Sequence, residues 1–246
     1  MAAPMAPLRR RLLAEAVGTA ALVTVVVGSG IAAQRLSPGD VGLQLLENST
    51  ATVFGLGVLI LVLGPVSGAH FNPVVSAADW LLGRRAGTGM PGSDVLAYCP
   101  AQVVGGVVGA VLANVMFDLD ALQIATKHRV TTGHLLAEMI ATAGLIAVIF
   151  ALARTGRAAL SAAAVGTYIG AAYWFTSSTS FANPAVTIGR VFSDTFAGIA
   201  PASVPGFVAA QVVGTLLGLA LVLALYPDAA VTADDAVVTH TSEGSR

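Results

Sequence analysis

Two short stretches of this chain decide its fold: SGAHFNPVVS at 67–76 and SFANPAVTIGR at 180–190. Each contains an Asn-Pro pair that lies within or just after a run of small residues. Asparagine is a favoured N-cap residue and proline is favoured at the first position of a helix, so each pair should begin a helix. We predict short helices at 73–82 and 184–192, each roughly 15 Å long, or about half the thickness of a bilayer.

The remainder of the chain is too apolar for a soluble domain. Of its 246 residues, 56% are hydrophobic and 10% are charged, whereas roughly 25% are charged in soluble domains. Such a chain could not cover a water-facing surface, so soluble enzyme folds are excluded. The net charge of −1 provides no electrostatic footprint for nucleic acid. The single cysteine excludes an intramolecular disulfide, and the four histidines show no metal-ligand spacing.

Six stretches reach the roughly 20 mostly apolar residues that a helix needs to cross a bilayer. They are 12–33, 44–64, 94–117, 131–153, 158–177 and 203–226. An even number of crossings puts both termini on one side of the membrane. The polar tail at 227–246 is expected to be disordered on that side.

Lysine and arginine residues indicate which side this is, because they are enriched in cytoplasmic loops. The side of the termini would hold eight of them: Arg9, Arg10, Arg11, Arg84, Arg85, Arg154, Arg157 and Arg246. The opposite side would hold four: Arg35, Lys127, Arg129 and Arg190. We therefore expect both termini in the cytoplasm and the chain in the cell inner (plasma) membrane.

The two halves of the chain resemble each other in three blocks that recur in the same order. LLAEAVGTAALV at 12–23 matches LLAEMIATAGLI at 135–146, and AQVVGGVVGA at 101–110 matches AQVVGTLLGL at 210–219. The two Asn-Pro stretches lie between these blocks. Since each half has three crossings, an odd number, the second copy enters the membrane from the opposite face. This pattern predicts an inverted repeat with a pseudo-two-fold axis in the membrane plane.

The expected fold is an all-α membrane protein with six transmembrane helices and two re-entrant half-helices. It would form one domain at 1–226, with repeats at about 8–118 and 131–226. Small residues at a spacing of four let membrane helices approach closely. Two such pairs occupy matched positions in the repeats: Gly105 with Gly109, and Gly214 with Gly218.

The two half-helices would form a pore where they meet, N-terminus to N-terminus, at the midplane. Irregular backbone at that depth is tolerated only where protein buries it or where it lines a wet cavity. The helix dipoles place positive potential there, and the side chains of Asn72 and Asn183 can donate hydrogen bonds to a passing oxygen. Such a pore suits small neutral hydroxylated solutes and opposes cations and protons.

These stretches resemble the paired Asn-Pro-Ala loops of the aquaporin and glycerol facilitator (major intrinsic protein) family, and the resemblance covers about residues 8–226. It implies one pore per subunit, usually in a homotetramer, with passive flow of small neutral solutes and no cofactor. It assigns the pore centre to Asn72, Pro73, Val74, Asn183, Pro184 and Ala185. Val74 replaces the usual alanine of the first box, which we expect to separate the half-helices only slightly.

The outer constriction departs from the family pattern. The family usually has arginine directly after the second box, where this chain has Val186. Arg190 follows one helical turn later on a similar face. It could reach towards the mouth of the pore, but we expect it to extend into water at the interface. The family spacing gives the remaining members of this selectivity filter as Phe54, Ala171 and Ser180. For the second span, Thr52 is the alternative if no gap is introduced.

Such a filter would be wider and less polar than that of a water-selective pore, and it would lack a fixed positive charge. TSSTSFANPAVTI at 176–188 resembles a bacterial branch often found beside arsenic-resistance genes. That resemblance implies passage of arsenous acid, methylated arsenicals and similar metalloid hydroxides, together with glycerol and water. A water-selective aquaporin is the alternative within the same family.

Two acids, Glu15 and Glu138, lie inside predicted spans, where ionisable residues deserve a functional interpretation first. They occupy equivalent repeat positions, and no intramembrane lysine or arginine accompanies them. The resemblance implies that each carboxylate hydrogen-bonds the backbone of a re-entrant loop. A proton-coupled secondary transporter that uses this pair is the alternative from a different functional class. His70 precedes the first box, and we expect it to line the cytoplasmic vestibule.

Overall fold

The computed structural model describes residues 6–84 and 89–227. Six of its helices are long and apolar enough to cross a membrane. They are α1 (Leu8–Leu36), α2 (Val41–Ser67), α4 (Gly92–Met116), α5 (Thr132–Arg154), α6 (Ser161–Phe175) and α8 (Val204–Leu225). Short 3-10 turns at Ala158–Leu160 and Pro201–Ser203 precede α6 and α8. The six predicted spans are confirmed to within a few residues, whereas the predicted tail lies, apart from residue 227, outside the described residues.

Two shorter helices begin at the Asn-Pro pairs, as predicted. These are α3 (Pro73–Gly83) and α7 (Pro184–Gly189), and a 3-10 turn at Arg190–Phe192 continues α7. An asparagine caps each of them: Asn72 Oδ1 accepts a hydrogen bond from the backbone N–H of Val74. Asn183 Oδ1 accepts from two backbone N–H groups at the start of α7. Proline at the first position and asparagine before it therefore fix where both half-helices start.

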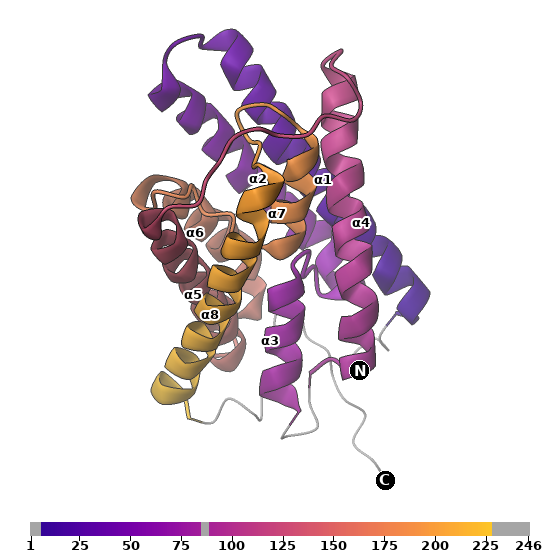
Figure 1. Cartoon of the computed structure of the whole chain (residues 1–246). Helices are drawn as coiled ribbons and strands as arrows, with labels where there is room; N and C mark the ends of the chain where they lie inside the picture. Colours follow the sequence, from indigo (N-terminus) through magenta and orange to yellow (C-terminus); the bar gives the residue numbers. More distant parts are fainter. Residues whose placement is uncertain (1–5, 85–88, 228–246) are drawn as a thin grey trace.

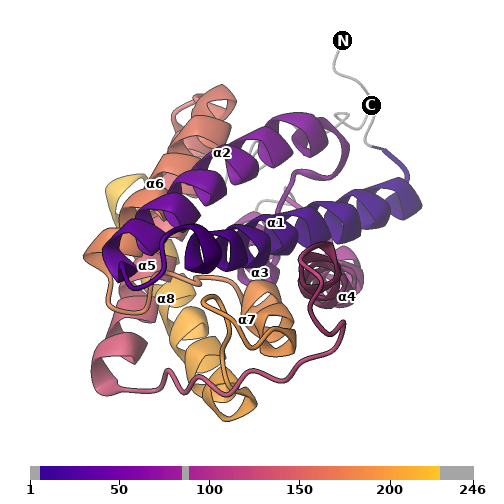
Figure 2. The ribbon, with the colours of Figure 1, turned by 90° about the horizontal axis from the view of Figure 1, so that it is seen from above.

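The two short helices lie between α4 and α8 (Figures 1 and 2). Helix α1 packs against α2 and α4, α5 packs against α6 and α8, and α2 packs against α6. Helices α3 and α7 contact each other, and each also contacts α4 and α8. The segment between α4 and α5 crosses the upper end of the molecule in Figure 1. Each half-helix is thus held by a long helix from both repeats.

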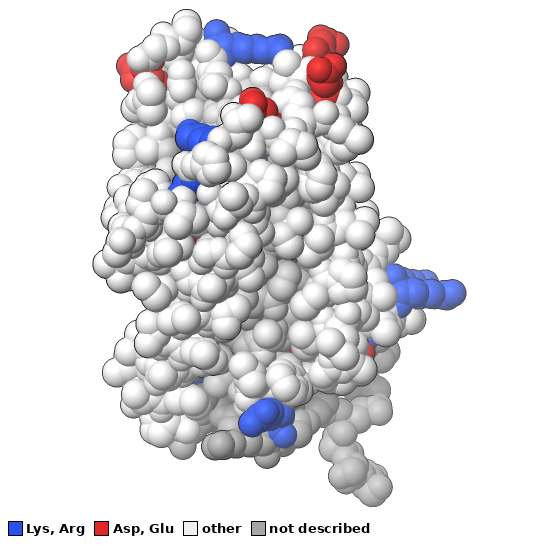
Figure 3. Space-filling model, viewed as in Figure 1, with Lys and Arg blue, Asp and Glu red and all other residues white. Residues whose placement is uncertain are grey.

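The outer surface of the helices is apolar. Large hydrophobic side chains remain exposed on α2, α4 and α8, including Leu61, Leu96 and Leu216. On the face shown in Figure 3, most charged side chains lie toward the upper and lower ends, with a largely uncharged surface between them. A helical protein with this distribution is suited to a bilayer, where hydrocarbon rather than water contacts its sides.

Glycines set the distance between the helices within each repeat. A Cβ added at Gly109 of α4 would lie 2.2 Å from the carbonyl oxygen of Ala20 in α1, and one at Gly105 would lie 2.3 Å from that of Ala16. In the second repeat, Gly214 of α8 makes the same kind of approach to α5, as does Gly218. The prediction that these small residues form helix-packing surfaces is confirmed.

Two buried carboxylates hold the loops that lead into the half-helices. Glu15 of α1 is fully buried and accepts four hydrogen bonds. Two come from the backbone N–H groups of His70 and Phe71, at 3.0 and 2.7 Å. The others come from the side chains of Ser67 and Gln102, each at 2.7 Å. A single side chain therefore satisfies backbone donors that helical hydrogen bonds cannot reach.

Glu138 of α5 repeats this arrangement in the second half. It is also fully buried, and it accepts from the backbone N–H groups of Phe181 and Ala182 at 2.8 and 2.9 Å. Ser178 and Gln211 donate to it at 2.7 Å each. Equivalent groups therefore donate to Glu15 and to Glu138, as expected for an internal repeat.

The loops held by these carboxylates adopt a backbone conformation that most residues avoid. Phe71 and Ala182, the residues that precede the two asparagines, have φ angles of 49° and 48°. Side chains with a Cβ rarely adopt this left-handed region, and a residue held there costs of order 1–3 kcal/mol. The buried hydrogen bonds to Glu15 and Glu138 stabilise it.

Replacing Gly109 with alanine should destabilise the packing of α1 on α4. The new methyl group would collide with the Ala20 carbonyl, and overpacking of this kind costs about 2 kcal/mol. Thermal unfolding of the purified protein in detergent measures the effect as a lower midpoint. Gly57→Ala is the matched control, because a Cβ there would lie 3.5 Å from the nearest atom, an ordinary contact. Equal midpoints for the two variants would contradict the packing role of Gly109.

Replacing Glu138 with glutamine should disrupt the second loop. One carboxylate oxygen would become an N–H donor that faces two other donors, and buried donors left without acceptors cost about 3 kcal/mol in total. We expect a lower unfolding midpoint and reduced solute flux. Glu47→Gln is the control, since among residues 6–84 and 89–227 Ser37 alone donates a hydrogen bond to this carboxylate. A Glu138→Gln protein with unchanged stability and flux would rule out this support role.

Candidate functional site

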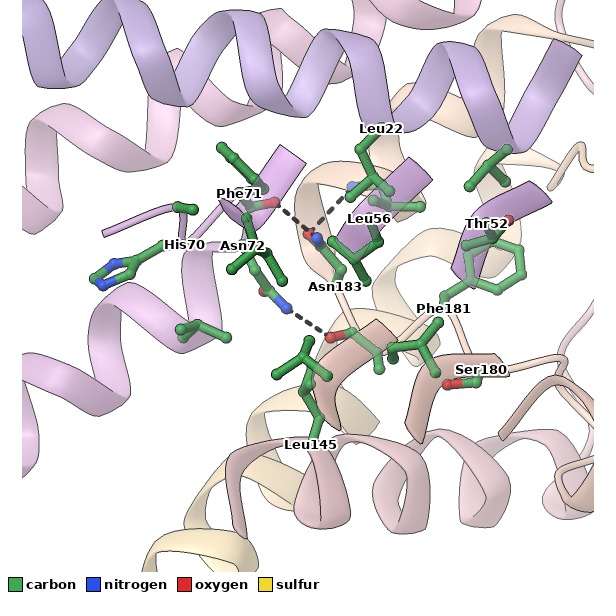
Figure 4. A pocket seen from close by; sticks show the side chains of 18 of the residues that line it. Leu22, Thr52, Leu56, His70, Phe71, Asn72, Leu145, Ser180, Phe181 and Asn183 are labelled. Carbon is green, nitrogen blue, oxygen red and sulfur yellow. Dashed lines mark hydrogen bonds between the residues drawn. The ribbon is translucent and has the colours of Figure 1, made fainter. Parts of the chain in front are cut away.

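A cavity lies between the half-helices and the long helices (Figure 4). In this view His70 is near one end, Asn72 and Asn183 are in the middle, and Thr52 and Ser180 are toward the other end. Hydrophobic side chains in rows along the long helices form much of its wall: Leu22 and Val26, Leu56 and Ile60, Leu145 and Ile149, and Val165 and Ile169. The cavity therefore has apolar sides and a few polar groups at defined depths.

The middle of the cavity is built by reciprocal hydrogen bonds between the two loops. Asn72 Nδ2 donates to the carbonyl oxygen of Ala182 at 2.8 Å, and Asn183 Nδ2 donates to that of Phe71 at 2.7 Å (Figure 4). Each side-chain oxygen is used in capping its own helix. Because an amide nitrogen has two hydrogens, each asparagine keeps a second N–H that a solute oxygen can accept.

The other residues of the two boxes do not line the cavity. Pro184, Val74 and Ala185 are buried, and the Ala185 carbonyl packs against Gly106 of α4. Pro73 is half-buried at the start of α3. These residues therefore bear on the pore centre through the positions of the two asparagines. Val74 does not prevent either hydrogen bond between the loops.

Only part of the predicted outer filter lines the cavity. Val186 and Ser180 do, whereas Phe54 and Ala171 are exposed, with Phe54 exposing 69% of its surface. The choice of Phe54 and Ala171 is therefore wrong. Two residues along a helix amount to a rotation of about 200°, so each lies on the opposite helix face from the residue that does line the cavity.

Thr52 and Tyr173 replace them. Both are buried and line the cavity, and the Thr52 Oγ1 lies 3.3 Å from the Tyr173 hydroxyl. The ungapped alignment of the second span gives Thr52 correctly. A spacing of four residues along α6 connects Val165, Ile169 and Tyr173, and this signal could have identified the lining face from the sequence.

Arg190 lies in the cavity wall and not in water, so the expectation for it is also wrong. Only 3% of its surface is exposed. Its Nε donates to the carbonyl oxygen of Ala197, and its guanidinium carbon lies 3.4 Å from the ring centroid of Phe181. The segment that follows the 3-10 turn folds back and supplies that carbonyl, which the local spacing alone does not reveal.

His70 lies at the opposite end of the cavity and is buried. Its Nδ1 is 3.0 Å from Ser76 Oγ, and its ring packs edge-on against Tyr98. Among the described residues that line the cavity, none is an aspartate or glutamate. Glu15 and Glu138 stay behind the loops and hold them. The arrangement can let a small neutral solute exchange hydrogen bonds while apolar walls surround it.

Comparisons with known proteins find a matching family and similar relatives. Residues 3–182 match the family described as Major intrinsic protein. The aquaglyceroporin AqpS of Rhizobium meliloti (strain 1021) is 49% identical over 214 residues, which covers 87% of this chain and 89% of that protein. Aquaporin NIP1-2 of Arabidopsis thaliana is 34% identical, over 66% of this chain and 56% of its own length.

A solved structure shares the fold. The X-ray structure of the aquaglyceroporin from Plasmodium falciparum superposes with a TM-score of 0.63 at 20% identity, and the match covers 88% of this chain and 96% of that one. The six spans, the capped half-helices and the family match lead to one conclusion. The chain belongs to the major intrinsic protein family and forms a passive membrane channel for small neutral solutes.

Proposed function

We propose that this channel conducts arsenous acid and related uncharged metalloid hydroxides, including methylated arsenicals, together with glycerol and water. The observation that supports this best is Val186 in the cavity wall at the outer end. Arginine is the usual family residue at this position, and its longer, charged side chain would occupy that space. Valine leaves the passage wider there, and Ser180 beside it offers a hydroxyl to a solute.

The solutes fit the wall chemistry. Arsenous acid is uncharged near neutral pH and presents three hydroxyl groups, as glycerol does. Such a molecule can accept from the second N–H groups of Asn72 and Asn183 while its remaining surface contacts Leu22, Leu56 and Leu145. A charged solute would lose its hydration along the same apolar walls without compensation.

Further parts of the proposal concern the assembly and its placement. The channel would be a homotetramer in the cell inner membrane, with both termini in the cytoplasm, and it would not act as an enzyme. Residues 1–226 would make one channel domain from the repeats at about 8–118 and 131–226. The exposed apolar side chains of α2, α4 and α8 are suited to contact with lipid or with other subunits.

One observation weighs against a proton-coupled transporter. Glu15 and Glu138 do not line the cavity, and each accepts four hydrogen bonds that maintain a loop. Protonation of either carboxylate during transport would remove acceptors from that loop. A channel also equilibrates its solute without a pH gradient, so collapsing the gradient should leave the entry of arsenous acid unchanged.

The substitution Val186→Arg tests the solute class. Entry of arsenous acid into proteoliposomes should be fast with the wild-type protein and fall at least tenfold with Val186→Arg, because the arginine would narrow the passage. Arsenic inside the vesicles, followed over time by mass spectrometry, measures the rate. Water permeability of the same vesicles reports whether each protein is folded and open.

Val186→Met is the matched control, since methionine is long but uncharged. A loss with Val186→Arg alone would assign the effect to charge and hydrogen bonding, whereas a loss with both would assign it to width. If neither wild type nor variants admit arsenous acid while water passes, the proposal is wrong and a water-selective channel becomes the better interpretation.

A further inference from the structure

Three basic side chains converge on one turn of backbone at the outer end of the cavity. Arg129, from the segment between α4 and α5, donates from Nε to the carbonyl oxygen of Gly198 at 2.7 Å and from Nη2 to that of Phe196 at 3.1 Å. Arg190 donates to the carbonyl between them, at Ala197. Lys127 reaches the Phe196 carbonyl from outside, at 3.4 Å. These contacts gather three positive charges above the pore.

Glu138, which holds the second loop, interacts electrostatically with Arg129 and Arg190 without contacting them. In the part of the chain that the structure describes, no carboxylate forms an ion pair with any of the three. Burial lowers the pKa of the Arg129 guanidinium to about 10, so this group is still charged at neutral pH. Both guanidinium groups lie against the ring of Phe181, which lines the cavity, with Cζ 3.4 Å from its centroid for Arg190 and 5.2 Å for Arg129.

Arg190 holds the segment after its half-helix through the hydrogen bond to Ala197, but comparison of the repeats shows that this role does not require a side chain in the cavity wall. Its equivalent in the first repeat is Asp79, by the same offset that relates Asn72 to Asn183. Asp79 also ties down the segment after its half-helix, by accepting from the backbone N–H of Met90 at 2.8 Å. Asp79 does not line the cavity, however, whereas Arg190 does. The first repeat thus performs the bracing with a negative charge away from the pore.

Arg190 has donors available to a ligand. Within the described residues, Nε is the only atom of this side chain with a hydrogen bond, so both terminal nitrogens remain for other acceptors. Ser180, which lines the same cavity, is 3% exposed, and its hydroxyl has no hydrogen-bond partner among the described residues. A buried hydroxyl without a partner is costly, and a ligand oxygen would relieve that cost.

We propose that Arg190 and Ser180 form a binding site for a small oxyanion at the outer mouth, with Arg129 and Lys127 adding positive potential around it. The planar guanidinium presents paired N–H donors that match two oxygens of one oxyanion. Beyond this site most of the wall is apolar, and Arg190 is the last lysine or arginine among the described residues that line the cavity, so the anion is held at the mouth and does not pass. An occupied site obstructs neutral solutes, and the same potential repels cations.

Inorganic phosphate is the probe, and glycerol entry into proteoliposomes is the reporter. The oxyanion site requires a channel that conducts glycerol but does not require passage of arsenous acid. The phosphate experiment and the arsenous acid experiment can therefore fail independently of each other. Phosphate should slow glycerol entry through the wild-type protein at least twofold relative to chloride at equal ionic strength. Arg190→Gln should lose at least four-fifths of that inhibition. Arg35→Gln should retain it, because Arg35 instead donates to the Phe117 carbonyl at the end of α4.

Two further measurements separate binding from misfolding. Glycerol entry in chloride shows whether Arg190→Gln is folded and open, and Arg190→Lys, which keeps the charge, should recover part of the inhibition. Isothermal titration of phosphate into detergent-solubilised wild type should give a binding signal that weakens at least tenfold in Arg190→Gln. No binding to the wild type, or equal binding and equal inhibition in Arg190→Gln and Arg35→Gln, would overturn the proposal.

Discussion

The structure depends on one constraint, which is that non-helical backbone inside a bilayer must find hydrogen-bond partners within the protein. Two re-entrant loops reach the middle of the molecule. In each loop, one buried carboxylate, Glu15 or Glu138, accepts the hydrogen bonds of the backbone N–H groups. Because these acids occupy fixed positions on long helices, the loops are positioned by helix packing and not by their own preferences. The glycines that let α4 approach α1, and α8 approach α5, set that packing and with it the shape of the pore.

The sequence predicts much of this fold because its decisive features are local. The caps at Asn72 and Asn183, the six apolar stretches and the small-xxx-small glycines each depend on residues a few positions apart, and the structure contains all of them. The inverted repeat follows from parity, since three crossings in each half reverse the second copy. Helix-forming patterns of this kind are visible in one sequence because helices need no distant partners to satisfy their backbone.

The end of the pore beside Val186 and Arg190 could be predicted only in part, because its geometry depends on distant contacts. An error of two residues in aligning α2 or α6 rotates a side chain to the opposite face of its helix, which is why Phe54 and Ala171 face outward while Thr52 and Tyr173 line the cavity. Arg190 depends on a carbonyl seven residues later, supplied by a segment without regular structure. Hydrophobic periodicity contains no information about such a segment. The sequence therefore does not predict that the segment folds back towards Arg190.

The relation between Val186 and Arg190 follows from the different ranges of steric and electrostatic forces. A side chain obstructs a passage only where its atoms lie, whereas the potential of a charge falls off slowly, as the inverse of distance, in a medium of low dielectric constant. Four residues of helix move a side chain by roughly 6 Å along the axis. In the proposed function, valine at 186 therefore leaves this part of the pore wider, while arginine at 190, packed on Phe181, keeps positive potential near it. In the usual family pattern, one arginine both narrows the pore and supplies its positive charge. In this chain the two properties belong to residues on neighbouring turns, Val186 for the width and Arg190 for the charge.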